Sequence, residues 1–118
     1  MILRRKAAES EIAGAWVNGR PAGYMRIERL WSKVPYVSWI VVDTSAARRG
    51  VAAALLELAD GVARESGSRW LFSSSQANAR SARAWHRRRG FEECGRIRAV
   101  NPDGSGEVFY RRPVSRNL

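Results

Sequence analysis

The sequence predicts an α/β fold of the mixed-sheet (α+β) type, with about six strands and two main helices, in which an antiparallel hairpin precedes a parallel crossover. Three observations predict it. Asn18-Gly19 separates two strand-like segments and is typical of a two-residue hairpin turn. Residues 36–42 form a nearly continuous apolar run, as expected of a strand covered on both faces. A helical pattern starts at Gly50 and leads to another short apolar segment.

The elements are expected in a simple order, separated by turn residues. They are strands over 12–17, 22–31 and 36–42, a helix over 50–66, a strand over 70–74, a helix from an Asn78 cap to Arg89, and strands over 91–100 and 107–112. Met25, Ile27 and Trp31 fall on one side of the second strand. The order predicts one domain over residues 1–118, with its core from about residue 12 to 112.

Composition limits the classes of protein. A hydrophobic fraction of 45% excludes a disordered chain. No segment approaches the roughly 18 apolar residues of a membrane span, and the first residues lack the apolar core of a signal peptide. We therefore expect a cytoplasmic protein without membrane contact. Because Cys94 and His86 are the only residues of their types, we expect no disulfide and no metal. Cys94 is expected to be a small buried residue.

The net charge of +10 would attract any polyanion, whether DNA, RNA, an acidic protein or a phosphorylated cofactor. Of the 21 basic residues only Lys6 and Lys33 are lysines. So strong a preference for arginine is more typical of coding bias than of a designed patch. Charge alone does not choose among these ligands.

The junction between the strand at 36–42 and the following helix has the chemistry of a phosphate site. Gly50 has no Cβ, so a ligand can approach its backbone closely. The first helical N–H groups, at Val51 and Ala52, and the positive end of the helix dipole point at the same place. Arg48 and Arg49 add guanidinium groups that suit phosphate oxygens. Ligands of such crossovers bind at the carboxyl ends of the strands, where this junction lies. A solvated turn is the alternative for the isolated Arg-Arg-Gly motif.

Two motifs resemble the GNAT acetyltransferase superfamily, and the likeness extends over roughly residues 12–112. Residues 42–52 are similar to the family's acyl-CoA pyrophosphate loop. Gly50 and Ala52 fit that loop, whereas Ala47 stands where the family commonly has Arg or Gln. Residues 85–91 are similar to the segment that closes over the pantetheine arm.

The resemblance implies direct transfer of an acetyl group from acetyl-CoA, as co-substrate, to an amine. It implies that the backbone groups of Ile40 and Val42 pair with the pantetheine arm, that the N–H of Val42 faces the thioester carbonyl, and that residues 48–52 hold the pyrophosphate. His86 stands four residues before Gly90, where many relatives have a Tyr that protonates the departing thiolate. Neighbouring arginines should depress the pKa of His86. An exposed helix residue is the alternative for His86.

Two further residues, Asn78 and Glu28, are also expected at the site. Asn78 resembles the asparagine that precedes this helix in the family, one residue further from Gly90 than in the usual spacing. Glu28 is the best candidate for a general base, because it faces away from the apolar side of its strand. A surface carboxylate in an ordinary strand is the alternative for Glu28.

The amino terminus departs from the family. The family normally begins with a strand and two helices that form one wall of the acceptor site, but only about eleven residues precede the strand at 12–17. This predicts a short variant with an open acceptor site, which suits a large acceptor such as a protein amino group, or a partner subunit that completes the cleft. Trp16, Trp31 and Tyr36 could form the surface of a homodimer or belong to the core.

Three function classes follow. The first is an acetyl-CoA-dependent N-acetyltransferase that acts on a small-molecule or protein amine. The second is a non-catalytic acyl-CoA-binding regulatory domain, which the Ala47 substitution and the missing base permit. The third is a basic nucleic-acid-binding module, ranked last because aromatic residues and arginines do not alternate on one strand face.

Overall fold

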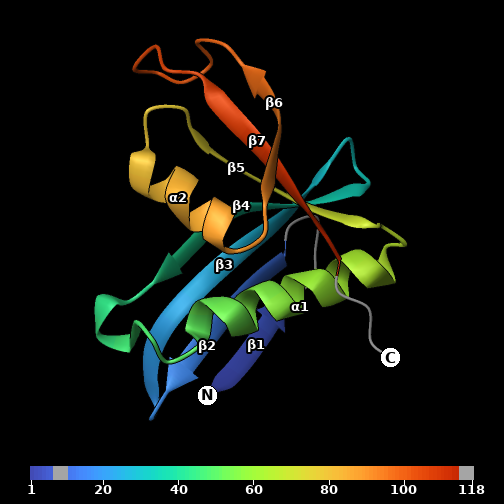
Figure 1. Cartoon of the computed structure of the whole chain (residues 1–118). Coiled ribbons are helices and arrows are strands. Elements are labelled where there is room, and N and C mark those ends of the chain that lie inside the picture. Colours follow the sequence, from blue (N-terminus) through green and yellow to red (C-terminus); the bar gives the residue numbers. More distant parts are fainter. Residues whose placement is uncertain (7–10, 115–118) are drawn as a thin grey trace.

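The computed structural model describes residues 1–6 and 11–114. All described strands join one mixed sheet, and both helices lie in front of it in Figure 1. In chain order the elements are β1 (Ile2–Lys6), β2 (Glu11–Val17), β3 (Arg20–Leu30), β4 (Val34–Val42), the short 3-10 helix η1 (Thr44–Ala46), α1 (Val51–Glu65), β5 (Trp70–Gln76), α2 (Arg80–Arg88), β6 (Glu92–Ile97) and β7 (Glu107–Pro113).

The strand order of the sheet is β1-β2-β3-β4-β5-β7-β6. Among the described strands, only β4 and β5 pair in parallel, and α1 connects them. The predicted mixed sheet and parallel crossover are therefore confirmed. The hairpin turn is also confirmed, because Asn18 and Gly19 separate β2 from β3 with φ values of 52° and 75°.

The sequence predicts about six strands, and the structure has a seventh, β1. It pairs antiparallel with β2, from Ile2 opposite Trp16 to Lys6 opposite Ile12. Its three consecutive basic residues break the alternation of apolar and polar residues by which a strand is recognised. Charged side chains are common at a sheet edge, where they oppose pairing with other chains.

Helix α1 packs across β2, β3, β4 and β5 and buries one side of the sheet. The core residues that meet there include Met25, Ile27, Val37, Leu55, Leu56, Val62, Leu71 and Val108. A buried ion pair connects α1 to β7. Arg112 of β7 donates from Nη2 to Oδ2 of Asp60, which is 2% exposed, at 2.7 Å.

Replacing Asp60 by Ala should lower the free energy of unfolding by about 2 kcal/mol, because the half-buried Arg112 guanidinium loses its carboxylate. Urea unfolding measures the change. Glu57→Ala, at an exposed position of the same helix, is the matched control and should change stability by less than about 0.5 kcal/mol. Equal losses in both variants would contradict a role for the ion pair.

Several local predictions are wrong. Trp31 does not share the core side with Met25, because it lies in the turn after β3 with φ 52° and is 79% exposed. Cys94 is exposed, since β6 is an edge strand. Asn78 does not cap α2. The N-cap is Ala79, which makes no side-chain cap bond, and the Asn78 side chain instead forms a hydrogen bond with Asp103.

No helix among the described residues is long and apolar enough to cross a membrane.

Candidate functional site

A cleft opens where β4 and β5 separate. The two strands pair only at Tyr36–Phe72 and Val37–Ser73, although β4 continues to Val42 and β5 to Gln76. The space between them is a cleft of about 500 Å³. Its lining comes from β4, β5 and α2, and consists of Val37, Ser38, Trp39, Ile40, Val42, Ser73, Ser74, Ser75, Ser81, Ala82, Trp85 and His86. Ile40 and Val42, predicted from the sequence, therefore lie on one wall and His86 on the other.

A bulge in β4 marks the start of this opening. Arg26 pairs with Trp39 while the next residue of β3, Ile27, pairs with Val37, so Ser38 is an extra residue on β4. Because a bulge shifts the alternation of side chains, Ile40 and Val42 point toward the helices beyond it. The sequence carries no signal for this bulge.

The amino terminus of α1 follows the end of β4 after η1. Gly50 is its N-cap in the left-handed conformation, with φ 73°, and a Cβ built there would meet no atom within 4 Å. The space over this backbone is thus open to a ligand. Arg48 and Arg49 are exposed beside it, and Val51 and Ala52 begin the helix. The Arg49 N–H, however, already donates to the Ala46 carbonyl at 3.1 Å, so it cannot also bind a phosphate in this conformation.

His86 lies between α2 and the sheet and is 4% exposed, so the alternative of an exposed helix residue is wrong. Its Nδ1 lies 2.7 Å from the Ala82 carbonyl, to which it must donate. Its Nε2 lies 2.8 Å from Ser73 Oγ, which donates to it in the neutral tautomer. The ring stacks on Tyr110 with centroids 4.3 Å apart. His86 is thus a neutral core residue that also reaches the cleft wall.

Burial lowers the pKa of His86 below its ordinary value, since the charged ring would lose its hydration. The sequence analysis expected the same direction but attributed it to neighbouring arginines. Those arginines, Arg87 to Arg89, are exposed, whereas the ring is not. Desolvation is therefore the main cause.

This depressed pKa should make stability depend on pH. The unfolded chain takes up a proton on its single histidine near pH 6.5, while the folded chain resists it, so the free energy of unfolding should fall as the pH drops below about 6.5. Thermal unfolding between pH 7.5 and 5.5 measures the effect. Carboxylates with lowered pKa values act only below about pH 4.5. His86→Phe, which can still stack on Tyr110, should flatten the dependence; an unchanged slope would contradict this assignment.

A chain of hydrogen bonds beside the cleft was not predicted. Ser74 Oγ donates to Glu107 Oε2 at 2.5 Å and lies 2.6 Å from the Tyr36 hydroxyl, which therefore donates to it. Asn101 Nδ2 donates to the other Glu107 oxygen at 3.1 Å. The sequence feature that could have indicated this path is the run of three serines, residues 73–75, at the end of a buried strand. Glu107, the partner of Ser74, is 33 residues away, so only the fold brings the two together.

Glu28, the predicted base, is half-buried on β3 directly opposite Tyr36 of β4. It contributes to raising the pKa of Tyr36, although burial is the largest cause of that rise. Two carboxylates, Glu28 and Glu107, therefore influence the same phenol. Asn78 is exposed in the loop before α2.

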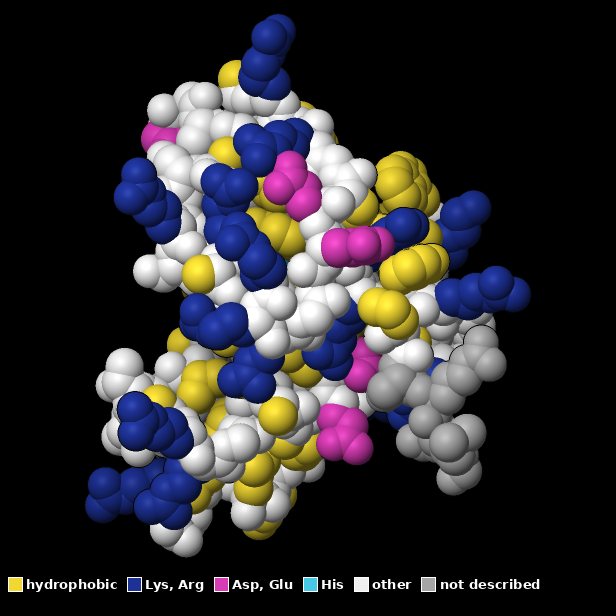
Figure 2. All heavy atoms as spheres, viewed as in Figure 1, with side chains coloured by type: hydrophobic (Ala, Val, Ile, Leu, Met, Phe, Trp, Pro, Cys, Tyr) yellow, Lys and Arg dark blue, Asp and Glu magenta, His cyan; other side chains and the backbone are white. Residues whose placement is uncertain are grey.

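Basic side chains are spread over the face that carries both helices, as Figure 2 shows, and only a few carboxylates interrupt them. Salt bridges occupy several arginines of the chain, including Arg83, Arg111 and Arg112. Among the described residues, the aromatic rings beneath arginines lie apart from one another: Trp16 under Arg4, Trp70 under Arg111, Trp85 under Arg89 and Phe91 under Arg112. The pattern is that of a dispersed positive field without a continuous stacking surface.

The fold and the cleft define a class: an α/β protein with a cleft between two diverging parallel strands. The chain belongs to the acetyltransferase (GNAT) family, whose model matches residues 2–91. This confirms the predicted family and fold class and makes the chain an acyltransferase by family. No metal-binding group of three or more His, Cys, Asp or Glu side chains occurs in residues 1–6 and 11–114.

Solved structures of the family superpose closely. A nourseothricin acetyltransferase is 29% identical, with a TM-score of 0.76 over 91% of this chain and 66% of its own. The ribosomal-protein-S18-alanine N-acetyltransferase of Escherichia coli is 22% identical, with a TM-score of 0.71 over 96% of this chain and 74% of its own. A GNAT acetyltransferase of Elizabethkingia anophelis with acetyl-CoA bound is 12% identical, with a TM-score of 0.77 over 89% and 76%. The chain thus spans slightly less than two thirds of the first of these proteins. No curated protein sequence matches it.

Proposed function

We propose that the protein transfers an acetyl group from acetyl-CoA directly to an amine. The observation that carries this proposal is the cleft, where β4 runs from Ser38 to Val42 without a partner on its β5 side, next to the open amino terminus of α1. An unpaired strand edge offers backbone N–H and C=O groups to an extended ligand. A helix amino terminus offers N–H groups to phosphate.

The pantetheine arm would pair with backbone groups of Ile40 and Val42, which line the cleft. The pyrophosphate would lie over Gly50, held by the N–H groups of Val51 and Ala52 and by the exposed side chains of Arg48 and Arg49. Asn78 would contact the cofactor from the side of α2. The open space over Gly50 supports this arrangement.

Chemistry needs a polarised carbonyl, a neutral amine and a route for two protons. The N–H of Val42 would polarise the thioester carbonyl as the amine nitrogen attacks it. The new C–N bond forms, the C–S bond breaks, and the nitrogen loses one proton. The departing thiolate takes up a proton; free thiols have a pKa near 8.5, so it can also leave with little help. His86 and Ser73 stand at the cleft wall and would assist this protonation.

The proton of the amine has two possible acceptors, and both are carboxylates beside Tyr36. Glu28 lies across the β3–β4 pair, and Glu107 connects to Tyr36 through Ser74. We favour the connected path. Tyr36 would accept the amine proton as it passes its own to Ser74, and Ser74 would pass its proton to Glu107. Burial raises the pKa of Tyr36, so the phenol starts each cycle protonated at neutral pH.

Calorimetry with acetyl-CoA at two salt concentrations tests the proposal. We expect saturable one-to-one binding, with dephospho-CoA and a short DNA duplex as comparison ligands. Binding without turnover of any amine would favour a non-catalytic acyl-CoA-binding domain. Salt-sensitive duplex binding without acetyl-CoA binding would refute the proposal and favour nucleic-acid recognition.

A further inference from the structure

The face of the sheet opposite α1 carries an apolar groove of about 660 Å³. Ala13 and Ala15 of β2 are buried under α1, so Ile12 and Trp16 face the other way and line the groove. Ile12 is 47% exposed and the neighbouring Tyr24 is 45% exposed, so large apolar side chains meet water there. Exposed apolar patches of this kind mark interaction surfaces.

Strand pairing places the groove residues in a row across four strands. Arg4 of β1 pairs with Gly14 of β2. Gly14 pairs in turn with Tyr24 of β3, which pairs with Val41 of β4. The Trp16 ring lies over Gly14, since an added Cβ there would come within 2.7 Å of the indole. The row therefore presents a cation at one edge, an indole and a phenol in the middle, and an aliphatic side chain at the other edge.

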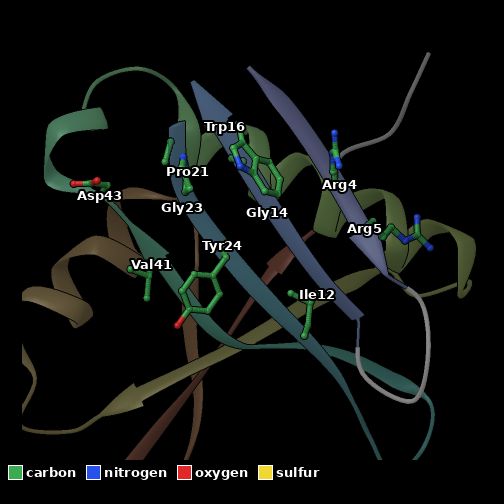
Figure 3. A pocket seen from close by; sticks show the side chains of 12 residues that line it. Arg4, Arg5, Ile12, Gly14, Trp16, Pro21, Gly23, Tyr24, Val41 and Asp43 are labelled. Carbon is green, nitrogen blue, oxygen red and sulfur yellow. The ribbon is translucent and has the colours of Figure 1, made fainter. Parts of the chain in front are cut away.

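The charged residues of the groove stand at opposite ends. Figure 3 shows Asp43 at one end and Arg4 and Arg5 at the other, with the apolar side chains between them. Arg5 already donates to Glu65 at 3.0 Å, so its charge is balanced within the chain. Asp43 is exposed and uses Oδ1 to accept from the Ser45 N–H at 3.1 Å, which leaves Oδ2 for a second bond. Arg4 and Asp43 are therefore the charges that a partner would meet.

This pattern is complementary to itself. A two-fold axis that runs along the strands between β2 and β3 lays β1 of one copy over β4 of the other, and β2 over β3. The Tyr24 phenol of one copy then meets the Trp16 ring of the other. At both edges Arg4 of one copy comes near Asp43 of the other. Each end of the groove thus meets the end of opposite charge.

We propose that a second copy of this chain covers the groove, in a symmetric dimer whose two sheets pack face to face. A purely anionic partner would leave Asp43 opposed by like charge, and a purely cationic partner would do the same to Arg4. A second copy satisfies both, because the two-fold axis reverses the order of the charges. Arg26 is exposed in the next row, where it pairs with Ile12 of its own chain. The same axis lays its aliphatic stem over Ile12 of the second copy and leaves its guanidinium at the rim.

The proposed interface lies beside the cleft. Trp39 lines the cleft, and its Nε1 donates to the Tyr24 hydroxyl in the groove at 2.8 Å. A second copy seated on Tyr24 would therefore also hold the Trp39 side of the cleft in place. The inference goes beyond the proposed acetyltransferase function and does not depend on it.

Sedimentation equilibrium and light scattering over a range of protein concentrations test the interface. The salt concentration is about 0.15 M, which screens the net charge of +10 beyond about 8 Å. We expect a monomer–dimer equilibrium, and Tyr24→Asp should raise its dissociation constant at least about a hundredfold, because it buries a charge in the apolar middle. The matched control is Trp31→Asp, at an aromatic residue that is 79% exposed and lies outside the groove, which should leave the constant unchanged.

A charge exchange tests the two-fold arrangement. Arg4→Glu and Asp43→Arg should each weaken the dimer about tenfold, whereas the double variant should recover most of the loss, because the exchanged charges attract again. Thermal unfolding identifies any variant that fails to fold. A protein that is monomeric at every concentration would overturn the inference, as would a dimer that Trp31→Asp weakens as much as Tyr24→Asp. A folded double variant without recovery would overturn the two-fold arrangement.

Acetyl-CoA binding, measured separately, keeps this inference apart from the proposed function. A monomer that binds acetyl-CoA contradicts only the interface. A dimer that does not bind acetyl-CoA contradicts only the proposed function.

Discussion

Replacing Arg48 and Arg49 together by glutamate is expected to weaken acetyl-CoA binding about a hundredfold. Both side chains are exposed beside the amino terminus of α1, where the space over Gly50 is open. Each guanidinium adds a charge-assisted bond to phosphate, and reversed charges repel the ligand. A hundredfold change corresponds to about 2.7 kcal/mol. Calorimetry with acetyl-CoA gives the dissociation constants.

The matched control is the double variant Arg69→Glu/Arg98→Glu, which changes the net charge equally at exposed positions away from the cleft. A local phosphate contact predicts that this control loses far less affinity. Equal losses in the two double variants would mean that only the overall positive field attracts acetyl-CoA. That result would remove the two arginines from the cofactor site.

Glu107→Gln is expected to lower kcat for amine transfer about a hundredfold while the KM for acetyl-CoA stays unchanged. The carboxylate ends the hydrogen-bonded path from Tyr36 through Ser74, and an amide cannot take up the proton. Tyr36→Phe breaks the same path at its first step, so it should cost a similar factor. If the residues act as one path, the double variant should lose little more than either single variant. Release of CoA thiol with the best probe amine measures these rates.

Glu28→Gln is the discriminating comparison, because Glu28 faces the same phenol from β3 but is not part of that path. A small effect there, beside a large one in Glu107→Gln, would assign the base to Glu107. The reverse result would restore Glu28 as the general base. Thermal unfolding of all variants separates lost chemistry from lost folding.

Much of the fold could be predicted from the sequence, because local patterns determine it. Asn18-Gly19 predicted a turn that only residues tolerant of positive φ can make, and both adopt it. Helical spacing predicted residues 50–66, and α1 covers Val51–Glu65. Strand β1 was missed because pairing with β2, not its own pattern, makes it a strand. Trp31 was misplaced because the end of a strand cannot be read accurately from alternation alone.

The candidate site, too, could be predicted only where it depends on residues that are neighbours along the chain. The junction proposed to bind phosphate is a continuous segment, so residues 48–52 alone could predict its chemistry. The hydrogen-bonded path and the burial of His86 could not be predicted, since Tyr36, Ser74 and Glu107 come from three strands. His86 likewise packs on Ser73 and Tyr110 of two other strands. The predicted cap by Asn78 is wrong, because α2 begins one residue later, with Ala79 as its N-cap.

The sequence by itself determined the order of most strands and helices, the turn at Gly50 and the family, because each depends on neighbouring residues along the chain. Only the tertiary structure decided where β4 leaves β5 and which carboxylate connects to Tyr36. The physical reason is that strand pairing, desolvation and long-range hydrogen bonds join residues far apart in the chain, and no local pattern records which partners will meet.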